Sequence, residues 1–236
     1  MPADVRSLPG RRGAVVCLVL GAVLLGAAAL LTVAVLRGAT DATDLSLDTA
    51  IHEAVRGQWW LLDLCRVLRL TGGPAFLTVL STVLVILLAV TRRWGWAAYL
   101  AATALGGVII SEWLKATVAR PRPVWADPYS VADGFSYPSG HALAGITNWV
   151  VYGVIVLFLV PGRAGRVVAV VLMVWGVAMA PSRLVLGVHW PADVVGGWLF
   201  GFGWVLVVSG VGLLLVNRRA GRSVVPGEPL PTRTVP

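Results

Sequence analysis

The chain has 236 residues, of which 58% are hydrophobic and 13% charged, and its mean hydropathy is +0.84. Soluble domains carry roughly 25% charged residues, so the composition excludes a single soluble core of this length and favours a bundle of membrane helices. The net charge of +8 does not indicate nucleic-acid binding, because the arginines form short clusters between apolar runs, the pattern that orients membrane proteins.

Six apolar runs predict an all-α, six-transmembrane helical bundle. The runs are Ala14–Leu36, Pro74–Thr91, Gly95–Leu114, Ala142–Val160, Val167–Pro181 and Val194–Val216. We expect one membrane domain over residues 1–219. The first run is too long for the apolar part of a signal peptide, so we expect an uncleaved span. The proline-rich tail, residues 220–236, is expected to be disordered and cytoplasmic.

Compact arginine pairs at alternate connections predict the orientation. Arg92–Arg93 and Arg218–Arg219 each adjoin an apolar run, as is typical of the cytoplasmic side. We therefore expect a multi-pass plasma-membrane protein with both termini in the cytoplasm. The two cysteines, Cys17 and Cys65, have no metal or redox spacing and are expected to pack as small side chains.

The connection over residues 37–73 predicts an interfacial amphipathic helix between the first and second spans. Its apolar residues recur every four positions, with charged residues between them: Leu47, Ile51, Val55 and Trp59 alternate with Asp44, Asp48, Glu53 and Arg56. The helix is either a connector packed on the bundle or a surface over which substrate approaches. No role is assigned to His52.

Three polar segments lie on one face of the predicted bundle: residues 115–123, 138–141 and 182–193. Lys115, Arg122 and Arg183 bring three fixed positive charges to this face, and Arg binds phosphate oxygens in a bidentate manner. Lys115 is the only lysine in the chain. Headgroup contact is the alternative explanation for such a cluster. Glu112, three residues before Lys115, is expected to pair with it.

The second segment, Pro138–His141, stands where the fourth span should begin. Ser139 can cap the helix, and Gly140 permits a close backbone approach to a ligand. Because a helix N-terminus offers free N–H groups and a positive dipole end, the segment predicts an anion cradle.

His189 and Asp193 are four residues apart, with Pro191 suited to the first turn of the sixth span. This spacing predicts that the carboxylate accepts a hydrogen bond from one ring nitrogen and leaves the other nitrogen free as a nucleophile. Two histidines and an aspartate are also zinc ligands. Three cations at the same site oppose a divalent ion, so we expect no metal and no cofactor.

The ordered motifs Lys115-x6-Arg122-Pro123, Pro138-Ser139-Gly140-His141 and Ser182-Arg183-x5-His189-x3-Asp193 resemble those of the type 2 phosphatidic acid phosphatase (PAP2) superfamily. The resemblance implies a metal-independent phosphatase in which His189 attacks phosphorus and Asp193 orients it. It implies that His141 protonates the leaving alcohol and then activates water. The phosphate-binding residues would be Lys115, Arg122, Ser139, Gly140 and Arg183.

Arg120 also precedes a proline, and only the offset from Lys115 favours Arg122, so Arg120 is expected to be an accessory anion contact. The motifs are also similar to those of vanadate-dependent haloperoxidases, but these are larger soluble enzymes. The substrates that the resemblance implies are phosphatidate, phosphatidylglycerol phosphate and undecaprenyl pyrophosphate, hydrolysed at the outer face of the bilayer. A lipid phosphotransferase and a non-catalytic lipid- or anion-binding transporter are the alternatives. The sequence does not indicate the oligomeric state.

Overall fold

The computed structural model describes residues 8–222, and all of its regular elements are helices, as the sequence predicts. The helices are α1 (Arg11–Leu36), α2 (Asp41–Ala54), α3 (Trp59–Thr71), α4 (Pro74–Val90), α5 (Trp94–Val118), α6 (Gly140–Ala144), the π-helical turn η1 (Gly145–Val150), α7 (Val151–Leu159), α8 (Gly162–Val185) and α9 (Pro191–Arg222).

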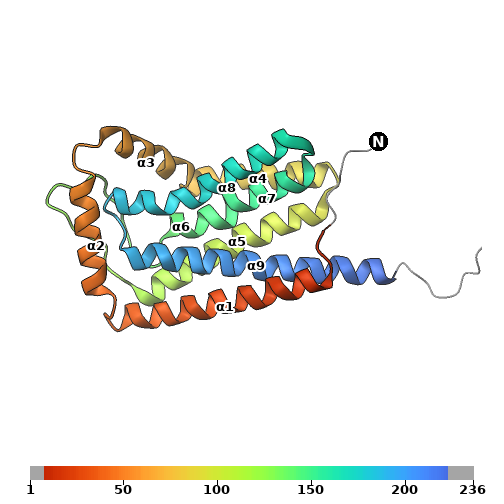
Figure 1. Cartoon of the computed structure of the whole chain (residues 1–236), viewed down its shortest axis with the longest axis horizontal. Coiled ribbons are helices and arrows are strands. Elements are labelled where there is room, and N and C mark those ends of the chain that lie inside the picture. Colours follow the sequence, from red (N-terminus) through yellow and green to blue (C-terminus); the bar gives the residue numbers. More distant parts are fainter. Residues whose placement is uncertain (1–7, 223–236) are drawn as a thin grey trace, which may run out of the picture.

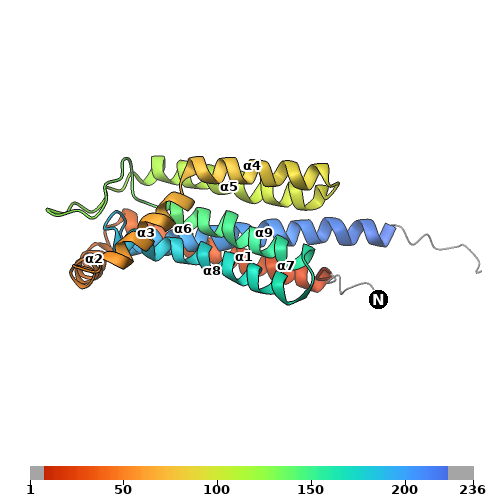
Figure 2. The same ribbon diagram turned by 90° about the horizontal axis from the view of Figure 1, so that it is seen from above.

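The long helices form a bundle, with α2 lying across one of its ends (Figure 1). Helix α1 packs along α9, α8 packs on α7 and η1, and α4 packs on α5. Figure 2 shows α4 and α5 as a layer beside the other helices. The start of α1 and the end of α9 lie at the end of the bundle opposite α2 (Figure 1). The loops that carry the three motifs lie at the α2 end.

Five of the described helices, counting α6 to α7 as one, are long and apolar enough to cross a membrane. Helices α3 and α4 together form a sixth candidate, bent by 52° at Gly72–Gly73. Proline at the first position of α4 accounts for the break, because the residue before proline avoids the helical conformation. The expected second span, Pro74–Thr91, is therefore the second arm of a broken element.

Several helices extend beyond the predicted apolar runs, and two of these extensions bear on the motifs and on the expected tail. Helix α8 extends past Pro181 to Val185, so Arg183 lies in its last turn and not in a connection. Helix α9 continues to Arg222, three residues beyond the expected end of the membrane domain. The remainder of the expected tail, residues 223–236, lies outside the described residues.

The connection over residues 37–73 forms two helices, separated by Gly57 at a positive φ of 79°. Helix α2 turns its polar stripe toward the bundle: Asp44, Asp48 and His52 are buried, whereas Leu45 and Leu47 are exposed. The residue pattern predicts the aspartates between the apolar positions, on the polar face of an interfacial helix. They face inward because Asp44 finds buried hydrogen-bond donors there, described below.

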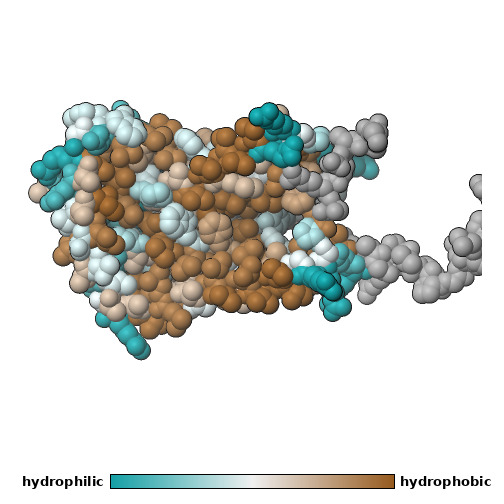
Figure 3. Space-filling model, viewed as in Figure 1, coloured by the Kyte–Doolittle hydropathy of each residue, from teal (hydrophilic) through white to brown (hydrophobic). Residues whose placement is uncertain are grey.

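The face of the bundle seen in Figure 3 is apolar between two polar ends. Helix α5 carries an exposed tryptophan near each end, Trp94 and Trp113. They are separated by 19 residues (113 minus 94), or about 28 Å at 1.5 Å per residue, close to the roughly 30 Å of bilayer hydrocarbon. Because tryptophan favours the membrane interface, these two residues indicate the two interfacial levels. Lys115 lies just beyond Trp113, at the end of the bundle that α2 covers.

Glycines allow the helices behind the motifs to approach closely. A Cβ atom on Gly145 would clash with the carbonyl oxygen of Gly176, and one on Gly197 would lie 2.6 Å from Cβ of Ala142. Both contacts involve the segment that follows His141. The close packing therefore fixes the position of this segment along the axes of α8 and α9.

We expect Gly145→Ala to destabilise the protein by about 1–3 kcal/mol or more, because the added methyl group meets a backbone carbonyl that is held in a helix. Gly26→Ala is the matched control, because open space surrounds that glycine on α1 and alanine favours the helix. Thermal unfolding in detergent measures both. Equal midpoints for the two variants would contradict the proposed role of this contact.

Candidate active site

His189 lies in the loop between α8 and α9, and Asp193 lies in the first turn of α9. Nδ1 of His189 is 3.3 Å from Oδ2 of Asp193, and the backbone N–H of Trp190 donates to the same oxygen at 2.9 Å. The predicted hydrogen bond across four residues is confirmed. The second ring nitrogen, expected to be free, lies 3.0 Å from Nη1 of Arg122.

The contacts of His189 define its tautomer. Arg122 is only a donor, so Nε2 accepts and the ring proton is on Nδ1, directed at Asp193. Burial lowers the pKa of His189 to about 4, against the opposing effect of Asp193, and the charges of Arg122 and Arg183 lower it further. The imidazole is therefore neutral at physiological pH, with the Nε2 lone pair directed toward the cations.

Arg122 is held by backbone carbonyls. Its guanidinium donates to the carbonyl oxygens of Asp133, Gly134, Phe135 and Val188 at 2.8–3.2 Å. The loop between α5 and α6 thus closes around this side chain and carries no carboxylate contact to it. The charge of Arg122 is oriented without being neutralised.

Arg183 is the least compensated cation among the motif residues. Its side chain is 3% exposed, and its Nε and Nη1 atoms have no hydrogen-bond partner. The charged side chains with the largest electrostatic effect on Arg183 are two further arginines, Arg122 and Arg69. Burying an unpaired cation is costly, so this position is suited to an anion.

Lys115, Gly140 and His141 complete the cluster. A Cβ atom on Gly140 would lie 3.5 Å from Nζ of Lys115, so the lysine lies over the start of α6. The expected ion pair with Glu112 is present at 2.9 Å. Nε2 of His141 lies 3.1 Å from the carbonyl oxygen of Arg69, and the cations that act on His141 include Arg183 and Lys115.

Ser139 is the N-cap of α6. Its Oγ accepts from the N–H of Ala142 at 3.5 Å, and its own N–H donates to the carbonyl oxygen of Asp193 at 2.9 Å. This backbone bond joins the start of α6 to the first turn of α9. The second and third motifs are therefore connected directly.

Arg120 is separated from the other cations by its partners. It donates to Asp193 at 3.0 Å, to Asp44 at 2.7 Å and to Asp41 at 3.1 Å. The sequence predicts an accessory anion contact for Arg120, whereas its guanidinium contacts carboxylates on the Nδ1 side of His189. Over residues 8–222, no group of three His, Cys, Asp or Glu side chains has the geometry of a metal site.

Sequence reasoning missed several residues at this site. Asp44, on α2, accepts from the N–H of Ala192 as well as from Arg120. Ser111 has a buried Oγ without a partner, and this atom would lie 3.6 Å from a Cβ on Gly140. The four-residue spacing from Asp44 to Asp48 and His52 was the available signal, because it places three polar residues on one helix face.

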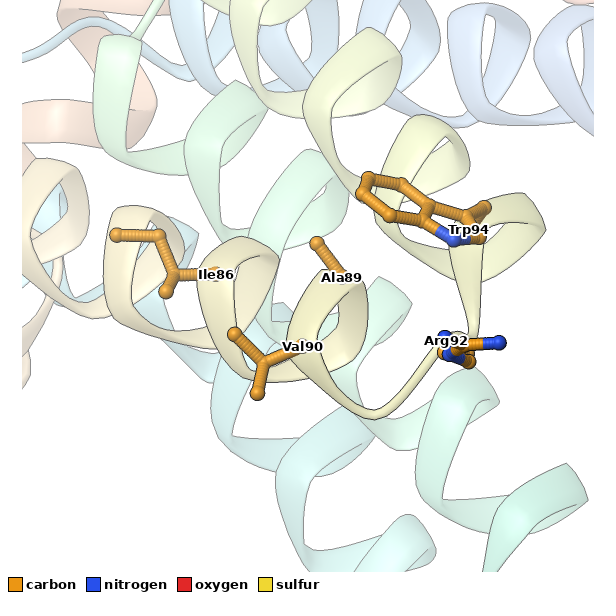
Figure 4. A pocket seen from close by; sticks show the side chains of 5 residues that line it. All are labelled: Ile86, Ala89, Val90, Arg92 and Trp94. Atoms are coloured by element: carbon orange, nitrogen blue, oxygen red, sulfur yellow. The ribbon is translucent and has the colours of Figure 1, made fainter.

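An open hollow of about 480 Å³ lies at the turn between α4 and α5, lined by Ile86, Ala89, Val90, Arg92 and Trp94 (Figure 4). None of the motif residues lines it. It is at the end of the bundle opposite α2. The motif residues are the candidate active site, because the buried charges and the oriented imidazole lie there.

The PAP2 superfamily model matches residues 95–213, which include all three motifs. The chain belongs to the PAP2 superfamily. Phosphatidylglycerophosphatase B of Escherichia coli is 28% identical over 171 residues, covering 56% of this chain and 64% of that relative. Undecaprenyl-diphosphatase of Sulfolobus acidocaldarius is 32% identical over 107 residues, covering 43% and 48%. The chain thus spans less than two thirds of the length of these relatives.

The fold of this PAP2 chain is that of a solved family member. The crystal structure of a transmembrane PAP2-type phosphatidylglycerolphosphate phosphatase from Bacillus subtilis matches with a TM-score of 0.68 and 22% identity, covering 88% of this chain and 98% of that one. Two of the contacts described above, from Asp44 and Arg69, come from α2 and α3, which precede the residues that the family model matches.

The carboxyl of Asp48 gives the fold a pH dependence. Its side chain is fully buried and both oxygens lack a partner. Burial, with the charges of Asp193 and Asp44, raises its pKa to about 7. The group is neutral in the folded protein and ionised in the unfolded chain between about pH 4 and pH 7, so the free energy of unfolding falls with rising pH by at most about 1.4 kcal/mol per unit.

Asp48→Asn removes this penalty. We expect the variant to match the wild type at pH 4 and to unfold at a higher temperature than the wild type at pH 8, measured in detergent. Asp63→Asn, on the exposed face of α3, controls for the loss of one carboxylate. A variant that follows the wild type at both pH values would show that Asp48 is ionised in the fold.

Proposed function

We propose that this protein is an integral membrane lipid phosphatase that hydrolyses a phosphomonoester or diphosphate through a phosphohistidine intermediate. The observation that carries the proposal is the buried guanidinium of Arg183, which has unpaired donors and cations for neighbours. A phosphoryl group at this position supplies the missing negative charge and accepts the unused N–H groups. Nε2 of neutral His189 faces the neighbouring cation Arg122, and the charge of Arg183 also acts on this imidazole.

In the first step, Nε2 of His189 attacks phosphorus as the bond to the leaving oxygen breaks. Asp193 accepts the Nδ1–H and stabilises the imidazolium that forms. His141 donates a proton to the leaving oxygen. Nη1 of Arg122, which contacts Nε2 at 3.0 Å, would then donate to a phosphoryl oxygen instead.

In the second step, water attacks the phosphohistidine and His141 accepts its proton. The P–N bond breaks, which releases inorganic phosphate and restores neutral His189. In both steps Lys115, Arg122, Arg183, Ser139 and the N–H of Gly140 stabilise the charge on the transferring phosphoryl oxygens. No step in this scheme uses a metal ion.

The depth of the site supports a lipid substrate. Lys115 lies two residues beyond Trp113, one of the two exposed tryptophans that indicate the interfacial levels. Trp59 and Trp60, at the start of α3, are also exposed. A lipid whose tail stays in the hydrocarbon presents its phosphate at this depth.

The names of the relatives narrow the substrates to test. Two of the relatives are named phosphatidylglycerophosphatase B and undecaprenyl-diphosphatase. We propose phosphatidylglycerol phosphate or undecaprenyl pyrophosphate as the substrate, with phosphatidate as the third candidate. A phosphate-release assay in detergent micelles across the three lipids ranks them.

We expect the purified protein to release inorganic phosphate in EDTA and to be inhibited by vanadate. His189→Ala removes the nucleophile and should lower turnover by at least about 10³-fold. Arg183→Ala should lower it by about 10²–10³-fold, because one donor to the transition state is lost. Arg163→Ala, exposed at the other end of the same helix, should retain wild-type turnover.

Phosphatase activity that depends strictly on an added metal ion would contradict the proposed mechanism. Transfer of the phosphoryl group to an added alcohol in preference to water would indicate a phosphotransferase on the same site. Phosphate binding with no release from any of the lipids would indicate a transporter or binding protein.

We also propose that the site is extracytoplasmic and that both termini are cytoplasmic. Arg92 and Arg93 lie at the end opposite the motifs, as do Arg163 and Arg166, which is typical of the cytoplasmic side.

Labelling of single cysteines, introduced into a variant that lacks Cys17 and Cys65, tests this orientation. A membrane-impermeant maleimide should label Val131→Cys in intact cells, because Val131 is an exposed residue of the motif-side loop. It should label Arg166→Cys only after the membrane is opened. The reverse pattern would place the site in the cytoplasm.

A further inference from the structure

The two carboxylate oxygens of Asp193 have different partners. Oδ2 faces Nδ1 of His189 and the N–H of Trp190, whereas Oδ1 accepts from Nη1 of Arg120 at 3.0 Å. The side chain of Asp193 is 0% exposed, so both of its oxygens are shielded from bulk solvent. The direction in which Asp193 presents Oδ2 to the imidazole therefore depends on what holds Oδ1.

Arg120 is itself held by α2. Its Nη2 donates to Oδ2 of Asp44 at 2.7 Å, to Oδ1 of Asp41 at 3.1 Å and to Oγ1 of Thr40 at 3.3 Å. The guanidinium is 8% exposed and lies 5.5 Å from the ring centroid of Trp190. With these acceptors in place, Nη1 and Nη2 are both engaged.

Asp44 closes the arrangement into a ring. Its Oδ2 accepts from Arg120, and its Oδ1 accepts from the N–H of Ala192 at 2.8 Å. Ala192 immediately precedes Asp193 in the first turn of α9. The ring runs from Asp193 through Arg120 and Asp44 and returns through the backbone of α9, which leaves the carboxylate of Asp193 little freedom to turn.

The charges around Asp193 explain why the bridging residue is a cation. The titratable and charged groups that face it are Asp44 and Asp48 from α2, Arg120 and Arg122 from the segment after α5, Tyr137 from the segment before α6, and His189. Arg122 donates to carbonyls and to His189. Arg120 is the cation that contacts both Asp44 and Asp193.

From this geometry we propose that Arg120 and Asp44 are positioning residues, which hold the carboxylate of Asp193 oriented toward His189, and that Arg120 does not bind the substrate phosphate. The inference rests on the proposed phosphatase function. Without Arg120, two buried carboxylates share one site with no cation between them, and one of them takes up a proton. A protonated Asp193 no longer favours the tautomer that leaves Nε2 able to attack.

The same contacts exclude the accessory-anion role. Three carboxylates surround the guanidinium of Arg120, so an approaching phosphate meets a net negative charge. Arg183 is the opposite case, because its neighbours are cations and its donors are unused.

The test compares Arg120→Gln, Arg120→Lys and the double variant Arg120→Gln/Asp44→Asn in the full chain in micelles. Measured quantities are kcat, KM and the vanadate inhibition constant over pH 5–9. The control is Arg56→Gln, an exposed arginine that pairs with Asp127 at the same end. Thermal unfolding verifies that each variant is folded.

We expect Arg120→Gln to lower kcat by about 10–100-fold near neutral pH, less than the roughly 10⁴-fold loss when the aspartate of a Ser-His-Asp triad is replaced. KM and vanadate inhibition should change less than about threefold, since each tenfold change needs 1.4 kcal/mol of lost binding. The acidic limb of kcat should move to higher pH. Adding Asp44→Asn should recover part of kcat, because the like charge is gone. Arg120→Lys, which keeps the charge, should leave the acidic limb in place.

Two results overturn the inference. A tenfold rise in KM and in the vanadate constant with unchanged kcat would make Arg120 a phosphate ligand. The ring would be purely structural if Arg120→Gln lowered kcat equally at every pH and the double variant recovered none of the loss. The same conclusion would follow if Arg120→Gln failed to fold and the added Asp44→Asn did not restore folding. Phosphate release by the wild-type protein is measured before any variant, and its absence would overturn the proposed function itself.

Discussion

The imidazole of His189 lies between two groups of buried charge of opposite sign, and both its protonation and its orientation depend on their separation. On the Nδ1 side, Asp193 is followed by Arg120 and Asp44. Arg122 lies on the Nε2 side, and the charge of Arg183 also acts on the ring. The field across the ring draws the proton to Nδ1 and the lone pair to Nε2, so the chain holds one tautomer of a neutral histidine.

The two sides differ in how their charge is compensated. The acidic side contains its own cation, Arg120, and the carboxyl of Asp48 avoids further repulsion because its pKa is raised to about 7. On the basic side, Arg183 keeps donors without partners. Folded proteins leave such groups uncompensated mainly at functional sites. The uncompensated side is thus the one that is suited to an anionic ligand.

Two contacts at the candidate site could be predicted from the sequence because they are local. The spacing of four residues brings Asp193 to His189, and three residues bring Glu112 to Lys115. Six apolar runs likewise predict the bundle, since hydrocarbon allows few alternatives to helices. The bend between α3 and α4 also had a local signal in Gly72, Gly73 and Pro74.

The contacts of Arg120 and the inward face of α2 could not be predicted in this way. Asp44 meets Arg120 across 76 residues of sequence, and no spacing rule reports such a distance. A charged stripe on an interfacial helix normally faces water. It faces the bundle here because Arg120 and the N–H of Ala192 offer it partners. The extension of α8 past Pro181 was missed for a related reason, because packing of α8 against α6 and η1 outweighs the tendency of proline to end a helix.

The charge separation at His189 also follows the direction of the helices. Lys115 and Arg183 lie in the last turns of α5 and α8, where the negative end of the helix dipole favours a cation. Asp193 lies in the first turn of α9, and the N–H groups around Ser139 open α6, where the positive end favours an anion. Helices α5 and α8 thus end, and α6 and α9 begin, at one level of the bundle, and together they favour charges of both signs there. Because helix ends in a membrane bundle lie near the interface, the same arrangement places the site where a lipid phosphate is found.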